Sequence, residues 1–302
     1  MRRWIAAGVA ASAMAAALAA PAMAEAKPAN PVDALKKQFV AGHGVKISEK
    51  TRTWIGREEY VGAVREGRIG FDAKGVAAVE NTRTPVMTPA LRKDLEKVGK
   101  TNEDTADAVD MLTERLYMIG SGNKLYVNGG LFSTLLPDDK TWVSVSGVPP
   151  YSAVAGDQLI DVFEPATLKT LLATAKRKGD QYRGTITFAD LYKVSPMFRN
   201  QTLMKPKGKL SKVVVSWRIT LDSNKLVKRV ASSWTMPVTK KLSMSVSSET
   251  RYTDWGTDVA ITAPDPSEVV DFKALTKKNY RPPTVDHNIV IVPPDDEGKV
   301  DQ

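Results

Sequence analysis

The sequence contains no cysteine and only two histidines in 302 residues. The lack of cysteine excludes disulfide bonds, thiolate metal sites, a cysteine nucleophile and an acylated cysteine behind a leader, so the chain is not a lipoprotein. His43 lies in a Gly-His-Gly break and His287 lies near the C-terminus, so the two histidines do not form a metal pair by spacing. We therefore expect no metal and no cofactor.

Catalytic sequence motifs are also lacking, since neither G-x-S-x-G nor a Walker sequence occurs. Ser121-Gly122-Asn123-Lys124 formally matches S-x-x-K, but its Gly-Asn centre is typical of a hairpin turn, and K-T-G is absent. We interpret Asp138-Asp139 and Asp295-Asp296-Glu297 as solvated charge. The prediction is a protein that is not an enzyme, with an unrecognised hydrolase as the minor alternative, because carboxylates distant in sequence can meet in a fold.

Only the N-terminus carries a long apolar run. Arg2 and Arg3 precede an Ala-rich stretch from Ile5 to Ala20, and Ala22-Met23-Ala24 offers small residues at a cleavage point. We expect residues 1–24 to be a signal peptide that is cleaved near Ala24; the alternative is an anchor that stays attached. The expected location is secreted or extracytoplasmic, in a cell envelope.

Acidic residues are outnumbered by basic ones, and the formal net charge is +9. For an exported protein, this favours anionic envelope polymers or lipid headgroups over nucleic acid; the alternative is a solvated basic surface. One basic cluster is Lys176-Arg177-Lys178. The second comprises Lys205, Lys207, Lys209 and Lys212 on a Pro/Gly loop, and we predict that it docks anionic headgroups or a membrane surface, unless it is an exposed loop without a partner.

Hydrophobic periodicity predicts a first helix near Asn30–Val40, which Asn30 and Pro31 begin. Two short helices are expected in an insertion near 86–113, and a longer helix over 157–175. The predicted strands of the N-terminal part are 45–55, 65–71, 76–82, 116–119, 124–128 and 142–146.

The C-terminal third alternates apolar and polar residues with period two, so each of its strands has one apolar face. About ten such antiparallel strands and a few short helices predict an α+β fold, a large curved half-barrel sheet wrapped over the helices. Such a sheet can leave an apolar cavity beneath it, and the alternative is a fully packed core. The residues predicted to face the cavity are Val215, Trp217, Ile219, Val230, Trp234, Leu242, Met244 and Val246.

The stretch from Arg251 to Val270 predicts how the sheet ends. We expect a strand that bends at Trp255-Gly256, restarts over about five residues, and stops at Pro264 and Pro266 on a sheet edge, before an acidic helix start. Residues 280–302 are Pro-rich and charged, which predicts a disordered tail.

The order of these elements over residues 30 to 276 resembles the LolA/LppX/LprG superfamily of bacterial envelope lipoprotein and lipid carriers. The residues that carry the resemblance are Leu116–Ile119, Lys124–Val127, Lys140–Val143, Tyr182–Thr185, Asp222–Leu226, Tyr252–Gly256, Val259–Ile261 and Pro264. The resemblance implies one domain over 25–279 that holds acyl chains beneath its sheet; some relatives serve as envelope sensors. This chain departs from the actinobacterial members in lacking their acylated cysteine and in its long insertion.

The sequence thus predicts a secreted, monomeric binding protein that holds a lipid or other amphiphile in an apolar cavity under its sheet. The alternative is an envelope sensor or interaction module that binds a membrane-anchored regulator.

Overall fold

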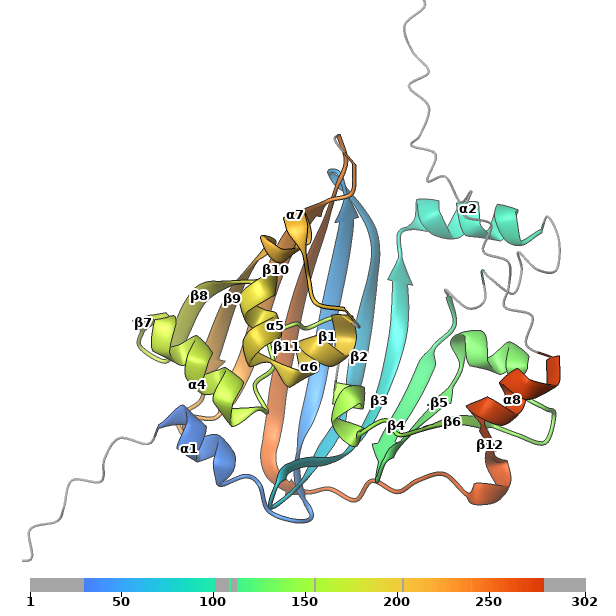
Figure 1. The fold of residues 1–302 in the computed structure, drawn as a ribbon, viewed down its shortest axis with the longest axis horizontal. Coiled ribbons are helices and arrows are strands. Elements are labelled where there is room, and N and C mark those ends of the chain that lie inside the picture. The colour runs from blue at the N-terminus through green and yellow to red at the C-terminus, as the bar shows by residue number, and fades with distance from the viewer. Residues whose placement is uncertain are drawn as a thin grey trace, which may run out of the picture.

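The fold is a single open, curved sheet of twelve strands with short helices packed on one face (Figure 1). The structure is a computed structural model, and it describes residues 30–279 except 101–108, 110–112, 155, 203 and 240. The predicted signal peptide over 1–24 and the predicted tail over 280–302 lie outside the described residues.

Neighbouring strands pair antiparallel, apart from β12, which runs parallel to β6. The order across the sheet is β12-β6-β5-β4-β3-β2-β1-β11-β10-β9-β8-β7. The strands are β1 (His43–Ile55), β2 (Glu58–Asp72), β3 (Gly75–Met87), β4 (Leu116–Ser121), β5 (Lys124–Asn128), β6 (Trp142–Ser146), β7 (Lys176–Lys178), β8 (Gln181–Thr187), β9 (Val214–Leu221), β10 (Val227–Pro237), β11 (Ser243–Asp258) and β12 (Val269–Asp271).

The helices lie mainly against one side of the sheet, which we call the inner face; the opposite side is the outer face. Figure 1 shows α4, α5, α6 and η2 in front of this side, α2 beyond the top of β3, and α8 beside β12. We call the end of the sheet with the β1–β2 and β10–β11 turns the upper end. The helices are α1 (Pro31–Lys36), α2 (Pro89–Gly99), η1 (Gly130–Leu135), η2 (Pro150–Val154), α4 (Pro165–Thr174), α5 (Phe188–Val194), α6 (Pro196–Thr202), α7 (Gly208–Ser211), η3 (Pro266–Glu268) and α8 (Phe272–Asn279).

Short polar residues begin several of these helices. The side chain of Asn30 accepts a hydrogen bond from the backbone N–H of Val32, which confirms the predicted start of α1. Thr187 does the same for α5 through the N–H of Asp190. Such caps fix where each short helix begins and so fix how it meets the sheet.

Apolar and polar residues alternate along the strands, and the apolar ones point into the core beneath the sheet. In β9, for example, Val215, Trp217 and Ile219 are buried, while the intervening residues are exposed. The helices contribute Leu168, Leu171, Leu191 and Phe198 to the same cluster. The predicted class, α+β with a curved sheet over short helices, is therefore confirmed, with twelve strands in place of about ten.

The helix predicted over 157–175 is shorter than expected. Helix α4 begins only at Pro165. Residues 157–164 are not helical, because polar side chains in this segment form hydrogen bonds with nearby backbone N–H groups. Gln158 and Asp161 each accept a hydrogen bond from a backbone N–H two residues later, which turns the chain under the sheet. Of the insertion near 86–113, α2 forms one predicted helix, and most of the second lies outside the described residues.

The predicted bend at Trp255-Gly256 is present as a register shift against β1, but the predicted break, edge position and stop were wrong. Strand β11 continues through Gly256, whose φ is +79°, to Asp258, and 259–261 do not form a strand. It is also not an edge strand, because it pairs with both β1 and β10. The chain beyond Pro264 pairs again, as β12, so the prolines do not end the sheet.

Candidate functional site

The residues predicted to face a cavity fall into two groups. Val215, Trp217, Ile219 and Val230 face inward but are 0–3% exposed within the helix-covered core. Trp234, Met244 and Val246 also face inward, half-buried near the upper end, and Leu242 lies half-buried in the turn before β11. The first group is therefore part of a packed core, and only the second lies where a ligand can approach.

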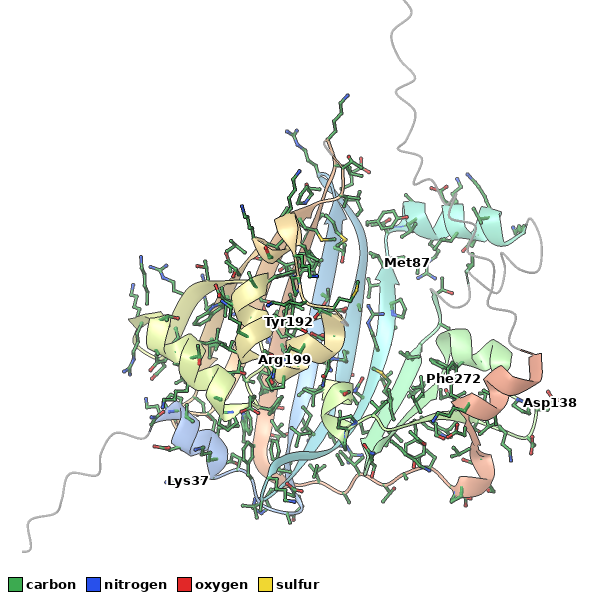
Figure 2. All side chains as sticks on the ribbon, in the orientation of Figure 1. Lys37, Met87, Asp138, Tyr192, Arg199 and Phe272 are labelled. Carbon is green, nitrogen blue, oxygen red and sulfur yellow. The ribbon has the colours of Figure 1, made fainter. Side chains whose placement is uncertain are left out.

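The middle of the inner face is closed by η2, the segment 156–164 and helices α4 to α6. Figure 2 shows Tyr192 and Arg199 on this layer of helices, where the Arg199 guanidinium donates 3.0 Å hydrogen bonds to the carbonyl oxygens of Tyr192 and Lys193. A space of about 10 Å³ remains beneath the layer. That is room for about one water molecule and far too little for an acyl chain.

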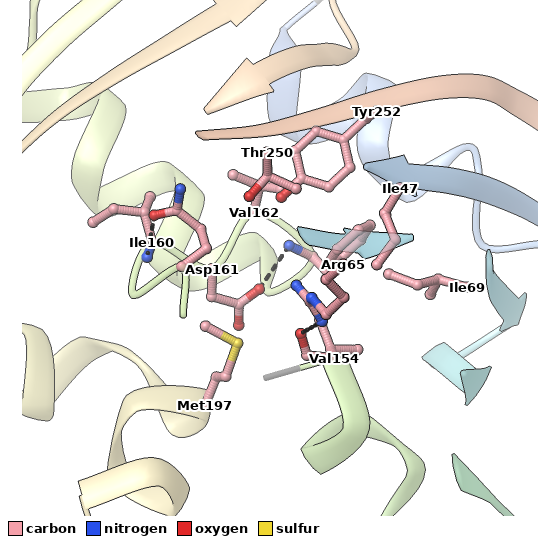
Figure 3. Close-up of a pocket in the computed structure, with 12 residues that line it drawn as sticks. Ile47, Arg65, Ile69, Val154, Ile160, Asp161, Val162, Met197, Thr250 and Tyr252 are labelled. Carbon is pink, nitrogen blue, oxygen red and sulfur yellow. Dashed lines mark hydrogen bonds between the residues drawn. The ribbon is translucent and has the colours of Figure 1, made fainter. Parts of the chain in front are cut away.

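The largely apolar lining of this small space is interrupted by polar side chains, among them Arg65, Asp161 and Thr250. Arg65 donates a 2.8 Å hydrogen bond to Glu49 and a 2.6 Å hydrogen bond to the carbonyl oxygen of Val154, and both ionic side chains are at most 4% exposed. Glu49 also accepts from the hydroxyl of Thr250 at 2.9 Å and from the backbone N–H of Asp157 at 3.0 Å. Figure 3 shows Arg65, Thr250 and Asp161 around the space. These hydrogen bonds compensate the buried charges and tie three strands to the segment that covers them.

Asp161 lies in the same lining, and burial raises the pKa of its carboxyl group to about 7. The backbone N–H of Phe163 donates to this carboxyl group at 2.8 Å, which opposes part of that shift. Burial likewise raises the pKa of the neighbouring Tyr252 hydroxyl. Within the described part of the chain, Arg65 Nε has no hydrogen-bond partner, and Arg65 borders the water-sized space. This centre holds the fold together and leaves no access for a substrate.

The four predicted docking lysines are exposed around α7 at the upper end. Lys209 and Lys212 line a groove of about 580 Å³, which we call the upper groove. Its other lining residues are Val213, Val214, Ser216, Ser233, Trp234, Thr235 and Pro237. The structure therefore brings together one of the predicted apolar residues, Trp234, and two of the predicted lysines, which lie on segments far apart in sequence.

Apolar side chains are unusually exposed around this end of the molecule. Met204 is 79% exposed, and Leu210, Val214 and Val238 are 43–48% exposed. These residues come from the loop before α7, from α7 itself, from the start of β9 and from the turn after β10. Clustered exposed apolar groups beside lysines are typical of an interaction surface.

The outer face carries a second hollow, which sequence reasoning did not identify. This outer groove has a volume of about 650 Å³ and crosses β8, β9 and β10, with Arg183 and Arg218 in its lining. Period-two alternation had placed Arg218 on a wet face, but the sequence gives no sign of which strands become neighbours. Of the predicted basic cluster 176–178, Lys176 borders this groove, whereas Arg177 lies over the ring of Tyr182.

Neither a metal centre nor a membrane span emerges from the described residues. No three His, Asp or Glu side chains among them are grouped so that they could hold a metal ion. Of the helices in the ranges that the structure covers, none is long and apolar enough to cross a membrane.

Comparisons with known proteins give only remote likenesses. No family model and no curated protein matches the chain. A LolA superfamily protein from Nitrosomonas europaea aligns at 8% identity and a TM-score of 0.28, over 76% of this chain and 93% of that one. A hypothetical protein from Chlamydia trachomatis aligns at 11% identity and a TM-score of 0.28, over 79% of this chain and 98% of the other. A porin-like protein from Bacteroides uniformis aligns at 7% identity and a TM-score of 0.24, over 72% of this chain and 98% of the other. Likenesses at these scores carry no weight for the function, which must be argued from the geometry above.

Proposed function

We propose that the protein is a non-enzymatic binding protein of the cell envelope that takes an anionic amphiphile in the upper groove. The observation that supports this is that Lys209 and Lys212 line the groove together with Val214, Trp234 and Pro237. The proposal keeps the amphiphile predicted from the sequence but moves it from beneath the sheet to the upper end, because the middle of the inner face is closed.

The two kinds of lining residue match the two parts of such a ligand. Ammonium groups attract a phosphate or carboxylate without demanding one fixed geometry, as suits headgroups that vary. Contact with apolar side chains stabilises an alkyl chain by about 0.8 kcal/mol for each buried CH₂ group. The ring of half-buried Trp234 points to the inner face and packs edge-to-face on Phe188 at 5.5 Å, which anchors the strand beside the groove to α5.

The loop before α7 and the turn after β10 carry further exposed apolar side chains. Met204 and Val238 would enter the headgroup region of an anionic membrane while Lys205 and Lys207 meet its phosphates. A carrier that exchanges its ligand with a membrane needs such a contact. The expected signal peptide would deliver the protein to the compartment where these ligands occur.

An interaction module is the second candidate, and the 79% exposure of Met204 favours it. A protein partner anchored in the membrane could cover Met204, Leu210 and Val238 as well as a lipid could. In that case, the lysines would contact acidic residues of the partner.

Binding of monomeric lysophosphatidylglycerol tests the proposal, with zwitterionic lysophosphatidylcholine as the comparison ligand. We expect the anionic ligand to bind at least tenfold more tightly, and Lys209→Gln/Lys212→Gln to remove most of that preference. Val214→Thr, which keeps the β-branched shape, should weaken both ligands. The matched control is Lys36→Gln/Lys37→Gln, which makes the same charge change on exposed residues of the lower end.

Equal binding of both ligands, or an equal loss in the two lysine pairs, would sink the upper-groove proposal. Tight capture of a membrane protein with no binding of either amphiphile would favour the interaction module.

A further inference from the structure

Three cations stand side by side on the outer face of the edge strands. Lys176 on β7 is paired with Arg183 on β8, which is paired with Arg218 on β9. All three side chains point outward and are exposed. We call them the cation row. Because neighbouring strands are about 4.8 Å apart, the row presents three positive charges over about 10 Å.

The cation row has no acidic partner, unlike several cations of the central strands. On the central strands, Arg229 and Arg251 share Glu249, Lys46 pairs with Asp254 at 2.9 Å, and Arg68 pairs with Glu80. In the residues that the structure covers, no ion pair involves Lys176, Arg183 or Arg218. Like charges directly opposite each other on a sheet are destabilising, so this arrangement is one that an anionic ligand would relieve.

The acidic side chains of the β7–β8 turn and of β11 on the same face are paired with other cations. Asp180, in the β7–β8 turn, is paired with Lys225 at 2.8 Å, and that contact lowers the pKa of its carboxyl group. Glu249 on β11 lies in line with the row but two strands beyond Arg218, because Ala231 on β10 stands between the two. Glu249 already forms ion pairs with Arg229 and Arg251. The row therefore keeps its full charge.

A second row, of hydroxyl groups, runs across the sheet two residues further along the strands. Thr185, Ser216, Ser233 and Ser247 are in register on β8, β9, β10 and β11. Among described side chains, none is a hydrogen-bond partner of these four hydroxyls. All four line the outer groove together with the cation row, and the small side chain of Ala231 keeps its floor low. Charge and unused hydrogen-bonding groups thus meet in one hollow of about 650 Å³.

We propose that the outer groove binds a segment of an acidic glycan. Guanidinium groups form paired hydrogen bonds with carboxylates, and a row of hydroxyls can exchange hydrogen bonds with sugar hydroxyls. A nucleic acid strand suits the groove less, because the one aromatic residue in its lining, Trp217, is 3% exposed and offers no face for a base to stack on. An acyl chain suits it less too, since cationic and hydroxyl side chains dominate its lining.

The glycan site is independent of the upper groove in its charges, although the two hollows share Ser216 and Ser233. Lys209 and Lys212 serve the upper groove only, whereas Arg183 and Arg218 serve the outer groove only. A variant of each pair therefore separates the two proposals.

Calorimetric titration with an oligogalacturonate tests the site, with an uncharged malto-oligosaccharide of the same length as the comparison. We expect the acidic oligosaccharide alone to bind, and Arg183→Gln/Arg218→Gln to weaken it at least tenfold. Ser216→Ala/Ser233→Ala should weaken it severalfold. Lys209→Gln/Lys212→Gln removes two charges as well and should leave glycan binding within twofold of the wild type.

Polyglutamate of matched charge separates a glycan site from a general cationic surface. If polyglutamate binds as tightly as the oligogalacturonate and the serine variant binds both normally, the proposal is overturned. An equal loss in the arginine and lysine pairs would overturn it too. Misfolding is not a concern for the arginine pair, because both side chains are exposed and their removal relieves repulsion; an unchanged or higher Tm confirms this.

Discussion

The middle of the inner face buries charged side chains, whereas the upper end of the same sheet exposes apolar ones. In the middle, Glu49 and Arg65 are buried and hydrogen-bonded to each other and to their neighbours. At the upper end, Met204 and Leu210 are exposed while the lysines beside them are solvated. A buried charge must find partners inside the protein, whereas exposed apolar surface finds them outside it. The closed centre therefore supports the fold, and the open end is where binding is to be sought.

Breaking the ion pair should produce the largest effect. Arg65→Met removes one partner and leaves Glu49 charged and 2% exposed, so we expect the free energy of unfolding to fall by about 3–5 kcal/mol in urea denaturation. Adding Glu49→Gln to this variant should restore much of the loss, since the uncompensated charge is then gone. A loss below about 1 kcal/mol in Arg65→Met would show that the pair does not hold the centre together.

The pH dependence of stability sharpens the same comparison. The folded state keeps the Asp161 proton up to a pKa of about 7, whereas the unfolded chain releases it near the ordinary aspartate pKa of 3.8. The folded state thus binds more protons in that window, so stability falls as pH rises through it, by at most about 1.4 kcal/mol per pH unit for this group.

Asp161→Asn should remove this part of the pH dependence, because the amide oxygen can still accept from Phe163 while no charge is buried. We expect the variant to be more stable than the wild type at pH 8 and similar to it at pH 4, as measured by urea denaturation at both values. Parallel stability profiles for the two proteins between pH 4 and pH 8 would contradict a raised pKa at this site.

A third prediction concerns the wall between the inner core and the outer groove. A Cβ atom at Gly184 would lie 2.6 Å from Cζ2 of Trp217, so Gly184→Ala should force the indole to shift and cost about 1–3 kcal/mol. The near-ultraviolet circular dichroism should change as well. As a control, Gly122→Ala changes a turn glycine with no atom within 4 Å of the added Cβ, and its cost should come only from its φ of +60°.

Much of the sheet could be predicted from sequence because alternation is a local signal. The faces of β9 to β11 were predicted residue by residue, down to Val215, Trp217 and Ile219 on the inner side. Strand order is not local, which is why β11 was wrongly placed at an edge and β12 was not expected. The polar centre also went unrecognised: Glu49 and Arg65 each sit in an alternating strand as ordinary charged residues, and their pairing depends on the register of β1 against β2.

The candidate site shows the same division. The lysines around α7 and the apolar face of β10 were each identified from the sequence, but only the fold reveals that Lys209 and Trp234 line one groove. The arginines of the outer groove carried no signal, since Arg183 and Arg218 lie 35 positions apart and become neighbours only through the pairing of β8 with β9. Composition indicated an anionic partner, and we propose two adjoining places for one, which share Ser216 and Ser233.

The smallest expected effect compares two arginines on the outer face. Arg251 contacts Glu249 at 3.1 Å, so Arg251→Gln should lower the free energy of unfolding slightly. Arg218 faces Arg183 and has no acidic partner in the ranges described, so Arg218→Gln should raise it slightly, each change staying within about 0.5 kcal/mol. Raising the salt concentration should shrink both differences, because exposed charges are screened. If both variants shifted Tm in the same direction at low salt, the cation row would not be under repulsion, and its need for an anionic ligand would lose its physical basis.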